Sequence, residues 1–408
     1  MKIIATALLL GSILTAGAAT PVPQTLDSNV PVGEAKGIIP GRVTWVHAPG
    51  AVTVDAEAEM WTDSRFFDQQ RIDTMMRDLV LDLTGASTER EAWLALIAHH
   101  NGGTPYAEGQ KIAVKINNNN TYSHADSPEV NATPAMVLAL LRSLVNGGGF
   151  PQECITIAEP SRFITDAVFN LCHAEFPNVS YVDNAGGNGR VKAEFKADAM
   201  AYSVDNGPLA RGIATCFTEA DYIINLALLK GHVGQGVTLC AKNWYGAMSL
   251  HADWRKNHHN NFDQNRNGEP KYITFVDYMG HKDLGGKCIL YLIDGLLGAK
   301  FVSGNPGPKW QMEPFNGDWP SSLLGSQDPV AIDMVGVDFI TTEFPDAPDT
   351  AFSDMYLNEA AQAGNAPSGT AYDPEGDGTT LTSLGLAEHW NNAAEKRHTK
   401  LDLHYLKR

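Results

Sequence analysis

Three side chains in the middle of the chain have types and spacing suited to acid–base chemistry: His232, Lys242 and Asn243. They follow residues 221–228, a nearly continuous apolar run that predicts a strand buried on both faces. An imidazole exchanges a proton near neutral pH, while an ammonium group and an amide stabilise developing negative charge. We therefore interpret His232, Lys242 and Asn243 as candidate catalytic residues.

Three glycines surround this histidine in the sequence: Gly231, Gly234 and Gly236. Glycine lets the backbone come close to a ligand, which favours a binding site at this position. The alternative is a tight glycine-rich connection that contains one hydrogen-bonded histidine. The residue types leave both interpretations open.

Polar residues also stand at the ends of other predicted strands and before one helix: Lys115, Asn117, Asp294 and Asp328. Ligands of open α/β sheets bind beyond the carboxyl ends of the strands, so we expect these four residues to bind substrate. Asp328 is followed by Pro329 and therefore also fits a helix N-cap. Glu159, at another strand end, fits either the site or a cap.

Strands and helices alternate along the chain, which predicts an α/β fold with a mainly parallel sheet and helices on both faces. We expect one domain over residues 40–344, with a polar insertion at residues 248–270. Residues 345–408 contain too few apolar side chains for a core of their own. This irregular C-terminal extension should wrap the main domain.

Four short motifs occur in a fixed order: Lys115-Ile116-Asn117, Lys230-Gly231-His232 with Gly236-Val237-Thr238, Lys242-Asn243-Trp244-Tyr245-Gly246, and Asp328-Pro329-Val330-Ala331-Ile332-Asp333. Through them the chain resembles the domain of unknown function 362 family over about residues 111–344. The resemblance implies that Lys115 and Asn117 belong to the site, but it implies no particular reaction. Some relatives carry ferredoxin segments, and this chain has none.

The order His232, Lys242, His258 is distantly similar to the nickel-pincer lactate racemases. In that family the lysine holds the pincer cofactor, and histidines serve as base and as nickel ligand. This chain has Cys240-Ala241 where those enzymes have two glycines before the lysine. The similarity therefore concerns fold and site position.

A transition metal is one cofactor that the residue types allow. The insertion is rich in histidine, and His251 and His258 are the candidate metal ligands. His258 and His259 cannot both face one ion from a regular helix, so we expect only one of these neighbours to bind.

Calcium is the second cofactor to consider, because two stretches resemble the start of a calcium loop. Each has oxygen-bearing side chains at alternate positions before a glycine: Asp263, Asn265 and Asn267 in one, and Asp373, Glu375 and Asp377 in the other. Both stretches lack the closing glutamate of such loops. An ordinary turn rich in Asp and Asn is the alternative.

The first residues suggest export. Residues 1–18 have the charged start, short apolar core and small-residue end of a signal peptide, and residues 19–39 read as a loose leader. We expect a periplasmic or extracellular protein. No later apolar stretch has the length of a membrane span, so none is expected.

The net charge of −17 and the absence of a basic run argue against nucleic acid as a partner. A small-molecule partner remains. We expect an exported enzyme that acts on a small hydroxylated substrate, a sugar or hydroxy acid, with a metal or cofactor allowed. The alternative is a non-catalytic exported protein that binds a metal or a glycan on a shallow aromatic surface of Trp61, Trp244, Trp254 and Trp310.

Overall fold

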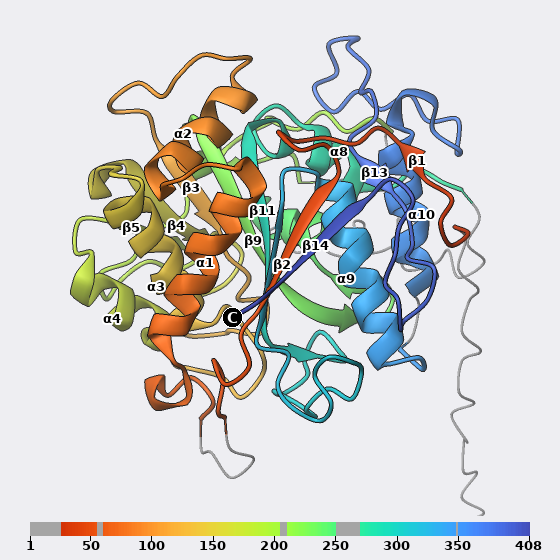
Figure 1. Cartoon of the computed structure of the whole chain (residues 1–408). Coiled ribbons are helices and arrows are strands. Elements are labelled where there is room, and N and C mark those ends of the chain that lie inside the picture. The colour runs from red at the N-terminus through yellow and green to blue at the C-terminus, as the bar shows by residue number, and fades with distance from the viewer. Residues whose placement is uncertain (1–25, 55–59, 205–209, 250–269, 348–349) are drawn as a thin grey trace, which may run out of the picture.

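The structure, a computed structural model, describes residues 26–54, 60–204, 210–249, 270–347 and 350–408 (Figure 1). Several sequence predictions concern residues outside these ranges. They are the signal peptide at residues 1–18, the candidate metal ligands His251 and His258, and the calcium loop of Asp263, Asn265 and Asn267.

A ten-stranded sheet forms the centre of the molecule (Figure 1). Its strands lie in the order β14 (Asp402–Lys407), β2 (Arg42–His47), β12 (Ser322–Ser326), β11 (Cys288–Ala299), β9 (Tyr222–His232), β3 (Ile112–Lys115), β4 (Ile155–Glu159), β5 (Ser180–Asp183) and β6 (Val191–Lys192), with β10 (Gly236–Thr238) paired to β9. Strand β12 is antiparallel to both neighbours and β10 to β9, while the other pairings described in this sheet are parallel. The prediction of an α/β fold with a mainly parallel sheet is confirmed.

Helices cover both faces of the sheet. One apolar layer includes α1 (Gln69–Thr84), α2 (Glu89–His100), α3 (Pro134–Arg142) and α4 (Asp166–Glu175). The other includes α6 (Cys240–Asn243), α8 (Thr274–Gly280), α9 (Pro329–Glu343) and α10 (Thr350–Ala361). Strand β9 contributes to both layers: Ile223 faces the second and Ile224 the first, as expected for alternating side chains.

The sequence fixes helix ends through local hydrogen bonds. Helix α1 begins after Asp68, whose side chain accepts a hydrogen bond from the backbone N–H of Arg71, and it ends at Gly85 in the left-handed conformation. Helix α2 begins with a reciprocal capping box between Thr88 and Glu91. These caps set the boundaries of the two helices that cover one face of the sheet.

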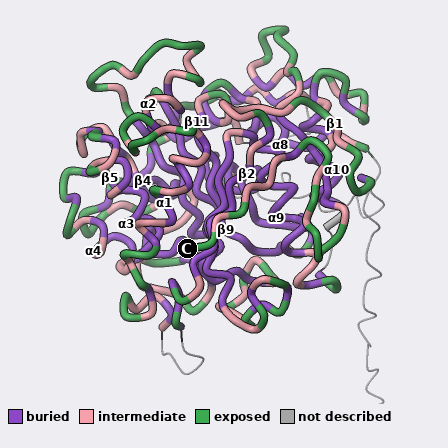
Figure 2. The backbone as a smooth tube through the Cα atoms, in the orientation of Figure 1, coloured by how far each residue is buried: buried purple, intermediate pink, exposed green. Residues whose placement is uncertain are grey.

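Shorter elements complete the described fold. Two small strand pairs are β1 (Val32–Gly33) with β13 (Leu386–Ala387), and β7 (Phe195–Lys196) with β8 (Ile213–Ala214). The short helix α5 covers Thr215–Thr218, and a π turn covers Ser143–Gly147. The 3-10 turns are Ser64–Phe66, Gln152–Cys154, Trp244–Ala247, Gly285–Lys287 and Ala363–Asn365. Residues near the C-terminus thus pair with both β1 and β2. Buried residues gather along the central strands, and exposed residues lie on the outer loops (Figure 2). Within the described ranges, no helix combines the length and the apolar character that crossing a membrane requires.

Candidate functional site

A small cavity of about 30 Å³ lies where the carboxyl ends of β3, β4 and β9 meet. The structure brings five of the sequence-predicted residues to its wall: Lys115, Asn117, His232, Lys242 and Asn243. This is the edge of the sheet at which α/β proteins bind ligands. The volume holds about two water molecules, so the cavity is lined closely by its side chains.

Lys115 and Glu159 form a buried ion pair at the base of this cavity, with 3.0 Å between Nζ and Oε2. The Lys115 ammonium also donates to the carbonyl oxygen of Ile116 at 2.6 Å and to Oδ1 of Asn243 at 3.1 Å. Burial lowers the pKa of Lys115, and the charge of Glu159 opposes this change. All three ammonium hydrogens have acceptors, so Lys115 is held in one position.

Asn243 has a fully bonded amide. Its Oδ1 accepts hydrogen bonds from Lys115 and Asn117, both at 3.1 Å. Its Nδ2 donates to Oδ1 of Asn225 at 2.8 Å and lies 3.3 Å from the carbonyl oxygens of Lys115 and Leu226. The amide of Asn243 therefore orients Lys115 and Asn117, which is a positioning role.

Lys242 lies on α6 with its ammonium 3.9 Å from the centroid of the Tyr245 ring, a cation–π distance. The start of this short helix is held from α9, because the Asp333 carboxylate accepts the backbone N–H groups of Cys240 and Ala241, each at 2.8 Å. Asp333 thus fixes the turn that carries Lys242. Asp333 belongs to one of the four short sequence motifs, but the motif did not indicate its contact with Cys240 and Ala241.

Two motif glycines are required by close approaches within the chain itself. A Cβ at Gly246 would lie 2.9 Å from both the Lys115 ammonium and a Glu159 oxygen, and a Cβ at Gly231 would lie 2.1 Å from the carbonyl oxygen of Lys300. Gly236 has a positive φ of 75° beside the turn between β9 and β10. These glycines therefore fit the alternative of a tight connection at least as well as a backbone approach to a ligand.

His232 ends β9 at the cavity wall. Its Nδ1 lies 2.7 Å from the carbonyl oxygen of Val233. A carbonyl oxygen only accepts, so Nδ1 carries the hydrogen in this contact, and in the neutral ring the lone pair is on Nε2. Nε2 is therefore the atom of His232 that can accept a proton.

Thr238 was not predicted as a site residue. It lines the cavity, its side chain is buried, and its hydroxyl has no hydrogen-bond partner among the residues that the structure describes. Buried hydroxyl groups without a partner are uncommon in folded proteins. The Thr238 hydroxyl thus adds one unused donor and acceptor group to the cavity wall.

Lys230 is a second residue that the sequence prediction did not assign to the site. It is fully buried in β9, opposite Thr238 in the β9–β10 pair, and it donates to the carbonyl oxygen of Val130 at 3.0 Å. Burial lowers the pKa of Lys230 to about 7. The sequence signal that could have identified Lys230 is its position two residues before His232, because residues two apart on a strand point to the same face.

Asp294 and Asp328 are not brought to the cavity wall. The Asp294 carboxylate accepts the backbone N–H groups of Thr133 and Leu296, each at 3.1 Å. Asp328 is the N-cap of α9, the alternative that the following proline indicated. Backbone N–H groups occupy both carboxylates, so the substrate-binding role expected for them finds no support in their contacts.

The second calcium-like stretch forms a turn rich in hydrogen bonds. The Asp373 carboxylate accepts the backbone N–H groups of Gly376 at 2.9 Å and Gly378 at 2.8 Å, while Glu375 accepts that of Lys282 at 2.7 Å. This is the geometry of an ordinary Asp-rich turn. Within the described ranges, no three His, Cys, Asp or Glu side chains are grouped to hold a metal ion.

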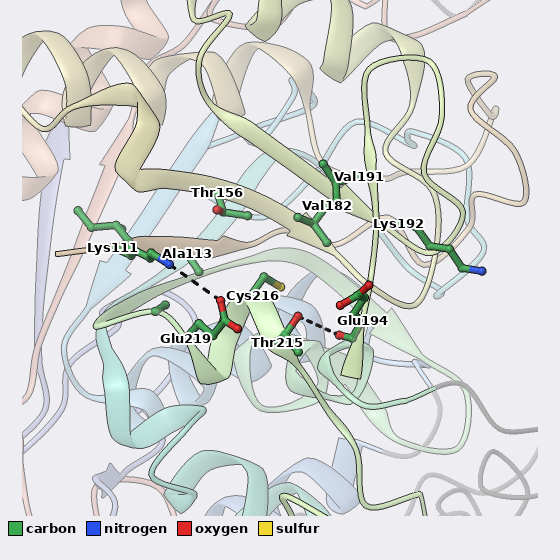
Figure 3. A pocket seen from close by; sticks show the side chains of 12 residues that line it. Lys111, Ala113, Thr156, Val182, Val191, Lys192, Glu194, Thr215, Cys216 and Glu219 are labelled. Atoms are coloured by element: carbon green, nitrogen blue, oxygen red, sulfur yellow. Dashed lines mark hydrogen bonds and ion pairs between the residues drawn. The ribbon is translucent and has the colours of Figure 1, made fainter. Parts of the chain in front are cut away.

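A larger cavity of about 360 Å³ lies between strands β3 to β6 and helix α5 (Figure 3). Lys111 and Glu219 face each other there at 3.9 Å, and Thr215 donates to the carbonyl oxygen of Glu194. Burial raises the pKa of the Cys216 thiol to about 12, so this thiol is unreactive at neutral pH. No sequence motif marked this cavity.

A family model described as a domain of unknown function (DUF362) matches residues 112–338. This range contains every residue described above at the small cavity. None of the curated proteins matches the chain.

Proposed function

Because the chain belongs to the domain of unknown function 362 family, whose description names no reaction, we propose its function from the chemistry of the small cavity. The protein is an exported enzyme that acts on a small hydroxy acid. The observation that carries this proposal is the meeting of His232, Lys242 and Thr238 at one cavity wall.

The charges at the cavity favour an acid over a neutral sugar. Lys115 and Lys242 line it, and Glu159, which pairs with Lys115, is the only carboxylate among the described lining residues. This local excess of positive charge occurs in a chain with a net charge of −17. Positive side chains that line a cleft attract an anion, so they support a substrate that carries a carboxylate.

Each residue has a role that its geometry permits. Nε2 of His232 takes a proton from the substrate and returns it, Lys242 pairs with the carboxylate, and the Thr238 hydroxyl bonds to a substrate oxygen. Asn243 and Lys115 position one another and keep the cavity in shape. Negative charge that develops during the reaction is stabilised by Lys242.

The glycan-binding alternative has less support. Its shallow aromatic surface required Trp61, Trp244 and Trp310, and all three are buried in the apolar layers. The fourth residue, Trp254, lies outside the described ranges. Buried indole rings cannot form an exposed stacking surface for sugars.

The proposal is tested by NMR on the full chain with a panel of small hydroxy acids and neutral polyols of equal size. The protein is purified without chelator, so that any ion held by His251 or His258 is kept. We expect binding and new product signals with one or more acids. Replacing His232 by Gln should reduce the rate roughly 100-fold or more, because general acid–base catalysis contributes at least that factor.

Lys242→Met tests the carboxylate contact and should weaken binding of the acid about tenfold or more, because a hydrogen bond to a charged group is lost. Lys282→Met is the matched control, since the Lys282 side chain is 62% exposed. Binding of polyols in preference to acids, with no product, would contradict the proposal and favour the non-catalytic alternative.

A further inference from the structure

Lys230 shares one face of the β9–β10 hairpin with two residues of the cavity wall. It lies directly opposite Thr238 in the antiparallel pair, and it precedes His232 by two positions on the same strand. Opposite residues of an antiparallel pair point to the same side, as do residues two apart on a strand. The Lys230 side chain therefore leaves the hairpin on the side of these two wall residues, although Lys230 is not itself among the residues that line the cavity.

Its surroundings differ from those of Lys115. The Lys115 ammonium has three acceptors, and one of them is the Glu159 carboxylate. Lys230 has one hydrogen-bond acceptor, the carbonyl oxygen of Val130, and within the described part of the chain no carboxylate lies within 4.0 Å of its nitrogen. A buried ammonium in such a place has two N–H bonds unsatisfied, whereas a neutral amine has a lone pair that needs none.

The electrostatics agree with this geometry. Burial lowers the pKa of Lys230 to about 7, and Glu159 opposes the change only in part. The neutral amine of Lys230 is therefore accessible near neutral pH, whereas an exposed lysine is almost entirely protonated. A neutral, buried amine is the activated form of a lysine nucleophile.

We propose that Lys230 forms a Schiff base with a small 2-oxo acid bound in the cavity. The inference rests on the proposed function, because the same lysine, Lys242, would hold the carboxylate. The Lys230 lone pair attacks the carbonyl carbon, and the carbonyl oxygen takes up a proton to give a carbinolamine. The nitrogen then loses its proton, its electron pair forms the C=N bond, and the hydroxyl leaves as water.

No oxidant or reductant takes part in this step, since amine and ketone give imine and water. His232 lies on the same face of the strand and can carry the protons between nitrogen and oxygen. The cavity is small, about 30 Å³, which favours the smallest members of this class of compound. Glyoxylate, the smallest 2-oxo acid, is therefore the probe.

The experiment incubates the full chain with glyoxylate and cyanoborohydride at pH 7, which reduces the imine to a stable secondary amine. Peptide mapping by mass spectrometry then locates the added mass. We expect at least tenfold more adduct on Lys230 than on Lys282 or Lys111, whose side chains are 62% and 59% exposed. Lys230→Met should lose this adduct and keep its melting temperature, because methionine fills the space without a buried charge.

Lys242→Met should lower labelling of Lys230 about tenfold while leaving the surface lysines unchanged. Adducts on Lys282 and Lys111 with none on Lys230 would overturn the inference. If Lys230 is labelled but no hydroxy acid is converted, the proposed function fails and the Schiff base stands. If Lys230→Met converts hydroxy acids at the normal rate and Lys230 is never labelled, the inference alone fails.

Discussion

The Thr238 hydroxyl is a buried polar group that the fold itself leaves without a hydrogen-bond partner among the described residues. Such a group costs about 1–3 kcal/mol of folding free energy when it is unsatisfied. A residue that stabilised only the strand would have no need of the hydroxyl. Its presence is explained if a molecule in the cavity bonds to it.

Thr238→Val separates a role in the stability of the strand from a role in binding a molecule, because valine has the same shape and the same preference for a strand but no hydroxyl. We expect the variant to melt at the same or a higher temperature and to bind the hydroxy acid about five- to tenfold more weakly, the effect of one lost hydrogen bond. Calorimetry measures the melting temperature, and ligand titration measures the affinity for the hydroxy acid. Thr238→Ser should restore binding, and a valine variant that is less stable but binds normally would contradict the assignment.

The residues at the cavity could be predicted from the sequence where they stand at the end of a strand that the sequence also predicts. Lys115, Asn117 and His232 follow apolar runs, and the carboxyl edge of a parallel sheet brings such positions together. Lys230 and Thr238 were missed because an unmet hydrogen bond or a lowered pKa depends on what packs around a side chain. Periodicity in the sequence carries no information on that.

At the scale of elements, α9 holds the short helix that carries the site. Asp333 accepts two backbone N–H groups at the start of α6, and Asp328 caps α9 itself. The sequence predicted α9 and its cap from Asp328-Pro329. It could not show that Asp333 reaches another helix, or that β14 pairs with β2, since contacts between distant segments appear only on folding.

Asp333→Asn replaces one accepting oxygen by an NH₂ group that faces a backbone N–H. We expect a loss of about 1–3 kcal/mol in unfolding free energy, because a buried donor is left unsatisfied, together with at least tenfold lower activity as Lys242 moves. Urea unfolding and the NMR assay measure these effects. Asp328→Asn is the matched control: it should lose stability but keep the substrate affinity of the folded protein. Equal losses of affinity in both variants would refute the specific role of Asp333.

At the scale of the whole molecule, a buried histidine joins the C-terminal region to two helices. Nδ1 of His389 lies 2.6 Å from Asp338 of α9, and Nε2 lies 3.2 Å from Asp354 of α10. Burial lowers the pKa of His389, but the hydrogen bond to Asp338 and the nearby charges of Asp338 and Asp354 outweigh it and raise the pKa to about 10. The imidazolium therefore links three segments at neutral pH.

This link predicts how stability depends on pH. The folded-state pKa is above the unfolded value of about 6.5, so the stabilisation is complete below that value and is lost as pH rises toward about 10. Thermal unfolding between pH 6 and pH 10 should show a falling melting temperature. Asp354→Asn should reduce this dependence because one carboxylate partner is removed, and an unchanged pH profile in that variant would argue against the link.

Helix α9 carries carboxylates at three positions spaced by five residues: Asp328, Asp333 and Asp338. Five residues turn an α-helix through about 140° beyond one full turn, so the three side chains leave the helix in different directions. Asp328 and Asp338 accept the backbone N–H groups of Leu386 and Trp390, while Asp333 holds the turn that carries Lys242. For protein engineering this means that removing the tail from Leu386 onward would take one partner from the Asp328 cap and the His389 and Trp390 partners from Asp338, on the helix that positions the site. An affinity tag after Arg408 leaves these bonds in place and is the safer choice.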